Sequence, residues 1–187
     1  MAIKLSILIP STPDRTKMTN ELHNKLCLSK YPDGSYVGDK DIEILIDWSA
    51  DIIGKKRNTM LSKARGEWLV FIDSDDTVCD NYVSNILEAI KTNPDCIGIN
   101  GTMTTNGQHP QQWFISKSCG RWFTRGNTHY RTPNHISPVR RELALQAGFP
   151  EVAFAEDYEY SMRLLPLLKT EVLITEPMYH YDYWNKK

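Results

Sequence analysis

The sequence predicts an α/β protein in one domain, with a mainly parallel sheet flanked by helices. Short apolar runs end in polar loops, and each of the first three is followed by a stretch with the features of a helix. An alternation of strand and helix is typical of a parallel sheet that is covered on both faces. The length of 187 residues suits a single domain with its own core.

The first half supplies this alternation. Met18, Leu22 and Leu26 recur every four residues, as on one face of a helix. Asp80 is a suitable N-cap for a later helix, which Asn93-Pro94 would end. The expected strands are 4–9, 42–46, 68–72 and 96–99, and the expected helices are 18–26, 54–64 and 82–90.

The second half is less regular. Between residues 101 and 141 aromatic, polar and turn-forming residues predominate, and we expect a hairpin around residues 113–123. Regular structure is expected again as helices at 141–147 and 157–168 and a final strand at 171–174.

Composition excludes several classes of protein. The formal net charge of −1 gives no overall attraction to nucleic acid or anionic lipid. No apolar run approaches the roughly 20 residues that span a bilayer, and the first residues do not resemble a secretory signal. We therefore expect no transmembrane segment and a cytoplasmic location. The cysteines form no CxxC pair, so we expect buried free thiols rather than a zinc or redox site.

Polar residues follow the apolar strands where ligands bind in open α/β sheets. Ser11, Asp47 and the run Asp73-Ser74-Asp75-Asp76 each come after a different strand. The carboxyl ends of parallel strands lie at one edge of the sheet, where diverging loops leave a crevice. One crevice is therefore expected to gather these residues.

The carboxylates of Asp73, Asp75 and Asp76 repel one another unless a cation lies among them. Alternation along a strand would direct Asp73 and Asp75 to one side and Asp76 to another. Oxygen ligands suit Mg²⁺ or Mn²⁺, which would stabilise a departing diphosphate. The alternative is an aspartate-rich turn that caps the next helix, but Asp80 is available for capping.

Glu156 and Asp157 open a predicted helix far along the chain. Carboxylates at a helix start often only complement the helix dipole. They gain interest because the second half could fold back over the crevice and present a base there.

Three segments together resemble the family 2 glycosyltransferases of the GT-A fold. They are LSILIPST, GKKRNTMLSKARGEWLVFIDSDD and SPVRRELALQAGFPEVAFAEDYEYSMRL. The resemblance covers roughly residues 3–181. It departs at Asp47-Trp48-Ser49, where the family often has paired acidic residues and a glycine, and the C-terminal region is short.

The resemblance implies a nucleotide-sugar donor, most simply a UDP-sugar, and residues that bind it. Ser11 and Asp47 would contact the nucleotide, with Asp47 on the base and Arg57 beside it. Asp73 and Asp75 match the DxD motif, whose first acid usually meets the ribose and whose second binds the metal, either Mn²⁺ or Mg²⁺.

The resemblance also implies a direct displacement with inversion at the anomeric carbon. Asp157 matches the catalytic base, and Glu156 would support it or bind acceptor. Asp76 would lie near the donor sugar, and His180 is a candidate third metal ligand, although a packed histidine among aromatics is the simpler reading. Residues 1–100 would form the nucleotide-sugar half, and residues 101–187 the half for the acceptor and the base.

Between Gly101 and Arg141 there is no acidic residue, and basic residues alternate with aromatic ones. This pattern suits a sugar ring stacked on an indole, or a phosphorylated acceptor that includes nucleic acid as one hypothesis. A solvated loop with a few buried anchors is the alternative. The basic residues are Lys117, Arg121, Arg125, Arg131, Arg140 and Arg141.

Two other functions fit parts of the sequence. An apolar strand followed by Asp73-Ser74-Asp75 resembles the nucleophile motif of a haloacid-dehalogenase-type phosphatase, although here two strands precede it. A non-catalytic module that only binds a nucleotide sugar is the second alternative, because a fold does not establish activity.

Overall fold

A computed structural model describes residues 3–31, 33–37 and 40–183. The helices are α1 (Thr16–Cys27), α2 (Ile53–Lys63), α3 (Tyr82–Ala89), α4 (Arg141–Ala147) and α5 (Glu156–Leu164). The strands are β1 (Leu5–Pro10), β2 (Ile42–Asp47), β3 (Trp68–Phe71), β4 (Thr77–Val78), β5 (Cys96–Thr105), β6 (Gln108–Ile115), β7 (Phe123–Arg125), β8 (Thr128–Arg131), β9 (Val139–Arg140) and β10 (Glu171–Tyr183).

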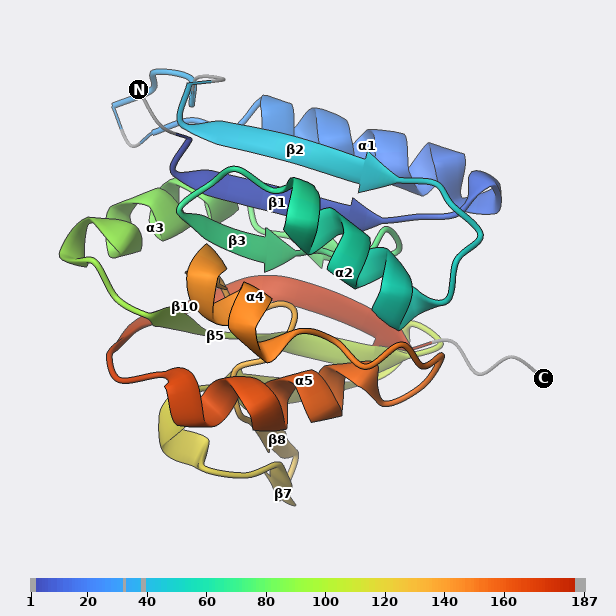
Figure 1. The fold of residues 1–187 in the computed structure, drawn as a ribbon, viewed down its shortest axis with the longest axis vertical. Coiled ribbons are helices and arrows are strands. Elements are labelled where there is room, and N and C mark those ends of the chain that lie inside the picture. The colour runs from blue at the N-terminus through green and yellow to red at the C-terminus, as the bar shows by residue number, and fades with distance from the viewer. Residues whose placement is uncertain (1–2, 32, 38–39, 184–187) are drawn as a thin grey trace.

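The sheet lies between two layers of helices, as the sequence predicts. Figure 1 shows α1 and α3 behind the sheet and α2, α4 and α5 in front of it. Side chains alternate along β1, so that Ile7 packs into the core beneath α1 and α3 while Leu8 packs into the core beneath α2, α4 and α5. The two cores fix both helix layers on the strands.

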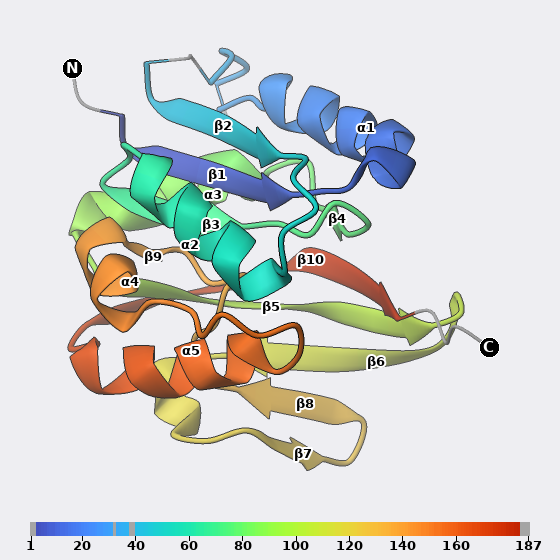
Figure 2. The same ribbon diagram turned by 45° about the vertical axis from the view of Figure 1, so that its right-hand side comes forward.

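Strand order places the edge that carries the polar residues. The order β2-β1-β3-β9-β5-β6-β8-β7 runs across the sheet, with β1 parallel to β2 and β3. β9 is antiparallel to both of its neighbours, and β10 is parallel to β5 and antiparallel to β4. Figure 2 shows β10 passing between β4 and β5. The turn after β3, which leads into β4, therefore lies beside β10.

The second half differs from the expectation for residues 113–123. The hairpins are β5–β6, which turns at Asn106-Gly107, and β7–β8. Asn106 and Gly107 have φ values of 52° and 69°, which a tight two-residue hairpin turn requires. β5 and β10 are also much longer than the predicted strands, and α5 ends at Leu164, before a 3₁₀ turn at Leu165–Leu167.

Two local expectations are wrong. Asn81, not Asp80, precedes α3 as N-cap, and the Asp80 carboxylate instead pairs with Lys25 at 2.9 Å. All cysteines are free, but only Cys96 is buried. The helices in the described part of the chain are too short or too polar to traverse a bilayer.

Candidate functional site

Two adjoining cavities open at the carboxyl edge of β1 and β3. The larger cavity, of about 390 Å³, contains Asp73, Asp76 and Asp157 in its wall. The smaller cavity, of about 350 Å³, contains Ser11 and Asp75. Both share the side chains Arg57, Asp73, Glu156 and Tyr181. The two cavities thus gather Ser11 and the aspartates after β3, but not Asp47, and they combine residues from both halves of the chain.

Arg57 is the link between the two halves. Its guanidinium donates to Asp73 Oδ1 at 2.9 Å and to Glu156 Oε1 at 2.7 Å. The group is nearly inaccessible, with 3 % of the side chain exposed, and it lies against the rings of both Phe71 and Phe149. The guanidinium is planar and presents its N–H donors in a fixed arrangement. Both carboxylates are therefore held in defined positions.

The aspartates occupy a turn rather than a continuation of the strand. β3 ends at Phe71, and the Asp76 amide donates to the Asp73 carbonyl at 3.0 Å. Asp73 and Asp76 consequently both reach the larger cavity, whereas Asp75 lies in the smaller one. The expectation that Asp76 points away from Asp73 is wrong, because strand alternation stops before these residues.

Each aspartate has a different environment. Burial alone would raise the pKa of Asp73, but Arg57 and His135 beside it hold that pKa well below its ordinary range. Burial and the charge of Asp73 raise the pKa of Asp76 well above its ordinary value. Asp75 pairs with Arg15 at 2.9 Å and is part-exposed. The turn thus combines a firmly ionised carboxylate with one that is costly to ionise.

Tyr179 holds the turn from β10. Its hydroxyl donates to Asp76 Oδ2 at 2.5 Å and accepts a 3.3 Å hydrogen bond from the Asp73 amide. The other oxygen, Asp76 Oδ1, is buried and has no hydrogen-bond partner within the residues described. An unpaired buried carboxylate oxygen beside two further acids is the donor chemistry that a hard cation satisfies. The described residues contain no cluster of three or more protein ligands around a common point.

Glu156 and Asp157 begin α5 beside this turn. Glu156 is buried and bound to Arg57, whereas Asp157 is half-buried in the wall of the larger cavity. Asp157 Oδ1 accepts the Tyr158 amide at 2.8 Å, which orients the carboxylate. Ala155 precedes them with a φ of 60°, a left-handed conformation that sets the direction in which α5 begins.

Ser11 and Asp47 are neighbours along the backbone of the sheet, but they line different cavities. The Ser11 side chain reaches the smaller cavity, and its hydroxyl hydrogen-bonds Thr19 at 2.7 Å. Asp47 offers its backbone carbonyl to the Ser11 amide at 2.9 Å. Its carboxylate, however, accepts the Ser49 amide and lies in a separate cavity along β2.

The His180 side chain does not form part of the wall of either cavity. Its ring nitrogens hydrogen-bond the hydroxyls of Thr102 and Thr104 at 2.7 and 3.3 Å. Its neighbours Tyr179 and Tyr181 instead line the larger cavity, because successive side chains of β10 point to opposite faces. The structure does not place His180 as a third ligand beside Asp75.

His135 is a site residue that the sequence reading missed. Its Nε2 lies 3.4 Å from Asp73 Oδ2, and its backbone carbonyl accepts the Phe71 amide at 3.0 Å. Its Nδ1 is buried and has no hydrogen-bond partner among the described residues. No periodic pattern marks this loop histidine. Tyr179 and Tyr181 could have been found, because a two-residue period places them opposite His180.

The segment between Gly101 and Arg141 contributes part of the larger cavity. Trp113, Trp122 and Arg131 lie in its wall, with Arg131 stacked on Trp122 at 5.0 Å. Burial lowers the pKa of Arg131, and the charge of Asp157 opposes that shift. Acidic, basic and aromatic groups therefore line the same cavity.

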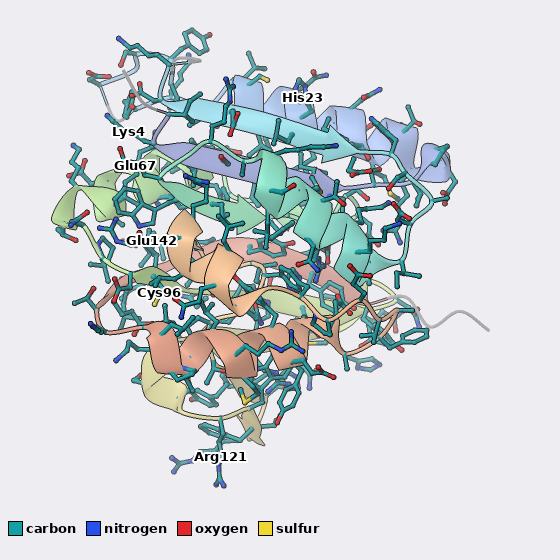
Figure 3. All side chains as sticks on the ribbon, in the orientation of Figure 1. Lys4, His23, Glu67, Cys96, Arg121 and Glu142 are labelled. Atoms are coloured by element: carbon teal, nitrogen blue, oxygen red, sulfur yellow. The ribbon has the colours of Figure 1, made fainter. Side chains whose placement is uncertain are left out.

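The basic residues of this segment lie on several elements. Arg121 projects from the tip of the molecule (Figure 3), and Arg125 is also exposed. Arg140 lies opposite Trp68, at the start of β3, and pairs with Asp95 there. It is therefore at the far end of β3 from the aspartates.

Comparison with known proteins identifies the family. The model of the family described as Glycosyl transferase family 2 matches residues 38–148, more than half of the chain, including Arg57 and the Asp73–Asp76 turn. The chain belongs to glycosyl transferase family 2. This membership makes it a glycosyltransferase domain and displaces the phosphatase alternative. No curated protein matches its sequence significantly.

Solved structures agree on the fold of this family 2 domain. Residues 1–349 of TarS from S. aureus align with TM-scores of 0.71 in complex with UDP-GlcNAc and 0.70 in complex with UDP, both at 20 % identity. The alignments cover 99 % and 96 % of this chain and 60 % of each TarS chain. A further TarS structure aligns at 0.66 with 20 % identity, over 96 % of this chain and 37 % of that one. The chain thus has the GT-A fold and spans about three-fifths or less of these TarS chains.

Proposed function

We propose that this domain transfers a sugar from a UDP-sugar to an acceptor hydroxyl, with inversion at the anomeric carbon and with a divalent cation. One observation carries the proposal. Asp157 lines the same cavity as Asp73 and Asp76, and Arg57 ties the two groups of acids together. An inverting displacement needs a base on one side of the reacting carbon and stabilisation of the leaving group on the other.

The smaller cavity is proposed to bind the nucleoside diphosphate. Arg15 and Lys56 lie in its wall, and α2 directs its N-terminus to the same region. The Lys56 ammonium donates to the Ser11 carbonyl at 2.5 Å, which fixes the loop after β1. The UDP-bound TarS structures share this fold, and they support a uridine nucleotide as the first donor to test.

A cation, Mn²⁺ or Mg²⁺, is proposed to be held by Asp75 and Asp73. The unpaired Asp76 oxygen and the concentration of acids support this assignment. When bound, the cation would offset the negative charge that develops on the departing diphosphate. Few protein ligands suffice, because Mg²⁺-type ions commonly complete their shell with phosphate oxygens and water.

Asp157 is proposed as the base. As the acceptor oxygen forms a bond to the anomeric carbon, the bond from that carbon to the diphosphate oxygen breaks, and the acceptor proton passes to the Asp157 carboxylate. Glu156 stays bound to Arg57 and holds the start of α5 against β3. Burial and the charge of Asp76 raise the pKa of Tyr181, which lies in the wall of both cavities, to about 12.

The acceptor is proposed to enter from the side of Trp122 and Arg131. Trp122 meets Tyr158 edge to face at 5.2 Å, so this wall offers aromatic surface next to Asp157. Aromatic side chains of this kind suit a sugar ring. On this proposal residues 1–100 bind the donor, and residues 101–187 supply the acceptor wall and the base.

The test is a panel of nucleotide sugars, measured by thermal shift with and without Mn²⁺ and followed by transfer assays with saccharide acceptors. A ligand that binds the native state raises its melting temperature. Metal-dependent stabilisation by one UDP-sugar, together with acceptor-dependent release of UDP, supports the proposal. Donor binding without release of UDP in the presence of any acceptor would favour a non-catalytic module that only binds the nucleotide sugar.

A further inference from the structure

A groove crosses β5, β6 and β8 on the opposite face of the sheet from the larger cavity. Figure 2 shows these strands at the end of the sheet away from β2. Because side chains alternate along a strand, His129 lines the larger cavity, whereas its neighbours Thr128 and Tyr130 line another cavity of about 520 Å³. An adjoining cavity of about 450 Å³ shares Thr102, Gln112 and Thr128 with it. We call these two cavities together the sheet groove.

Strand pairing sets the pattern of side chains in the sheet groove. Two rows of directly paired residues cross β5, β6 and β8, and they are Asn100, Phe114 and Tyr130 in one row and Thr102, Gln112 and Thr128 in the other. The first row is largely aromatic, and the second is polar. Each aromatic ring of β6 and β8 therefore has an amide or a hydroxyl group two positions away on its own strand.

The aromatic row extends onto β7. The ring centroids of Phe114 and Tyr130 are 6.2 Å apart in an edge-to-face contact, and Tyr130 stacks on Phe123 at 4.7 Å. Phe114 and Tyr130 are half-buried, and 37 % of Phe123 is exposed. Contiguous exposed aromatic surface marks an interaction site more often than scattered apolar residues do. This row is therefore a candidate binding surface.

The wall of the sheet groove has hydrogen-bonding groups but, in the part of the chain that the structure describes, no charged side chain. The side chains of Gln112, Thr128 and Tyr130 hydrogen-bond no other described residue, so their polar groups can bind a ligand. Amide and hydroxyl groups both donate and accept hydrogen bonds. A nucleic acid would instead need basic side chains to neutralise its phosphates.

A sugar ring combines an apolar face of C–H groups with a rim of hydroxyl groups. The apolar face packs on aromatic rings, and the hydroxyl groups pair with uncharged amides and hydroxyls. Both kinds of partner alternate in the sheet groove. We propose that the sheet groove binds a neutral saccharide chain, as a second site on the opposite face of the sheet from Asp157. This binding does not depend on the donor and acceptor proposed for the larger cavity.

The test is calorimetry with maltohexaose, cellohexaose and chitohexaose as probes, without donor or metal. We expect at least one probe to bind, and we expect Tyr130→Ala to raise its Kd about tenfold, as loss of a central aromatic contact typically does. Gln112→Ala changes an exposed residue of β6 and should also raise this Kd, at little cost to folding. Tyr36→Ala truncates an aromatic side chain that is 59 % exposed outside the groove, and it should bind the probe as the wild type does.

Further measurements separate this site from the larger cavity and from an interface. Saturating UDP with Mn²⁺ should leave the Kd for the oligosaccharide unchanged. Failure of all three probes to bind would overturn the inference, and so would wild-type affinity in both Tyr130→Ala and Gln112→Ala. Loss of binding in Trp122→Ala but not in Tyr130→Ala would assign the sugar to the larger cavity instead.

The oligomeric state in solution tests a second copy of this chain as the occupant. We expect sedimentation to give the same mass for the wild type and for Tyr130→Ala. A wild-type dimer that Tyr130→Ala converts to a monomer would show that a second copy covers the groove, and the inference would then be wrong. A wild type that binds an oligosaccharide but no nucleotide sugar would contradict the proposed donor and leave this inference standing.

Discussion

Arg57 donates a 2.7 Å hydrogen bond to Glu156, although 99 positions separate them in the sequence. The same guanidinium also binds Asp73, so the end of β3 and the start of α5 are held by one side chain. Asp157 adjoins Glu156, and its position relative to the aspartates depends on this contact. Arg57 is therefore a positioning residue in the proposed reaction.

Arg57→Lys should lower both activity and stability. One ammonium cannot reproduce two bonds to separate carboxylates, and the remaining buried acid would lose its partner. We expect a loss of about 1–3 kcal/mol in the free energy of unfolding and at least ~10-fold in kcat. Denaturant unfolding measures the change in the free energy of unfolding, and transfer kinetics measure the change in kcat. Arg163→Lys, on the exposed face of α5, is the matched control. Equal stability and equal kcat of the two variants would contradict the role of Arg57.

Asp157→Asn should separate binding from chemistry. The amide keeps the size of the side chain but cannot take the acceptor proton, so kcat should fall by about 10²–10⁴-fold. The melting shift caused by donor should remain. Glu159→Gln removes a neighbouring charge of α5 that pairs with Arg163 at 3.3 Å, and it should retain activity. Turnover at the wild-type rate by Asp157→Asn would exclude it as the base.

Asp75→Ala should abolish metal dependence. Without this carboxylate, Mn²⁺ should no longer increase the stabilisation by UDP in a thermal-shift titration. Asp80→Ala serves as control, because Asp80 is an exposed acid after the same turn and pairs with Lys25. Retention of a Mn²⁺-dependent shift in Asp75→Ala would place the cation elsewhere.

Because of the environment of Glu43, we expect part of the free energy of unfolding to depend on pH. Burial alone would raise the pKa of Glu43, but hydrogen bonds from Ser6 and Arg65 together outweigh it, so the pKa lies below the ordinary value of 4.5. A lowered pKa in the folded state contributes stability above the unfolded pKa, and this contribution is lost as the pH falls through the folded pKa.

Glu43→Gln should consequently be less stable than the wild type at pH 7, by about 1–3 kcal/mol. The difference should shrink as the pH is lowered below about 4. Urea unfolding at both pH values measures it. A difference that stays constant with pH would show that the charge of Glu43 does not contribute.

The local pattern of the chain predicts the first half of the fold well. Apolar runs such as Trp68–Phe71 can be recognised as strands from the sequence alone, since a buried parallel strand is apolar throughout. The end of β3 and the turn after it follow from the same signal. The way in which Asp76 turns toward the cavity does not, because it depends on a hydrogen bond from Tyr179, distant in the sequence.

The second half was harder to predict for identifiable reasons. β5 continues through threonines that look like a loop, although Thr favours strands. Pro177 interrupts the pattern of β10, and the register shifts around this residue accommodate it. The Asn106-Gly107 turn was a readable hairpin signal. His135 and the Arg57 pairing are tertiary contacts, and no local pattern contains them.

The late position of β10 in the sequence also affects when, during synthesis, the domain can complete its fold. The ribosome makes the chain from its N-terminus, so Ser11 and the aspartates of the turn are complete well before Tyr179 and Tyr181 emerge. Only then can the final strand insert beside β5 and β4 and hold the turn in place. A nascent chain that has folded through α5 already contains every proposed reacting acid, yet it lacks the strand that orders them. On the proposed function, we therefore expect the donor to bind only after β10 has been translated and has docked beside β4 and β5.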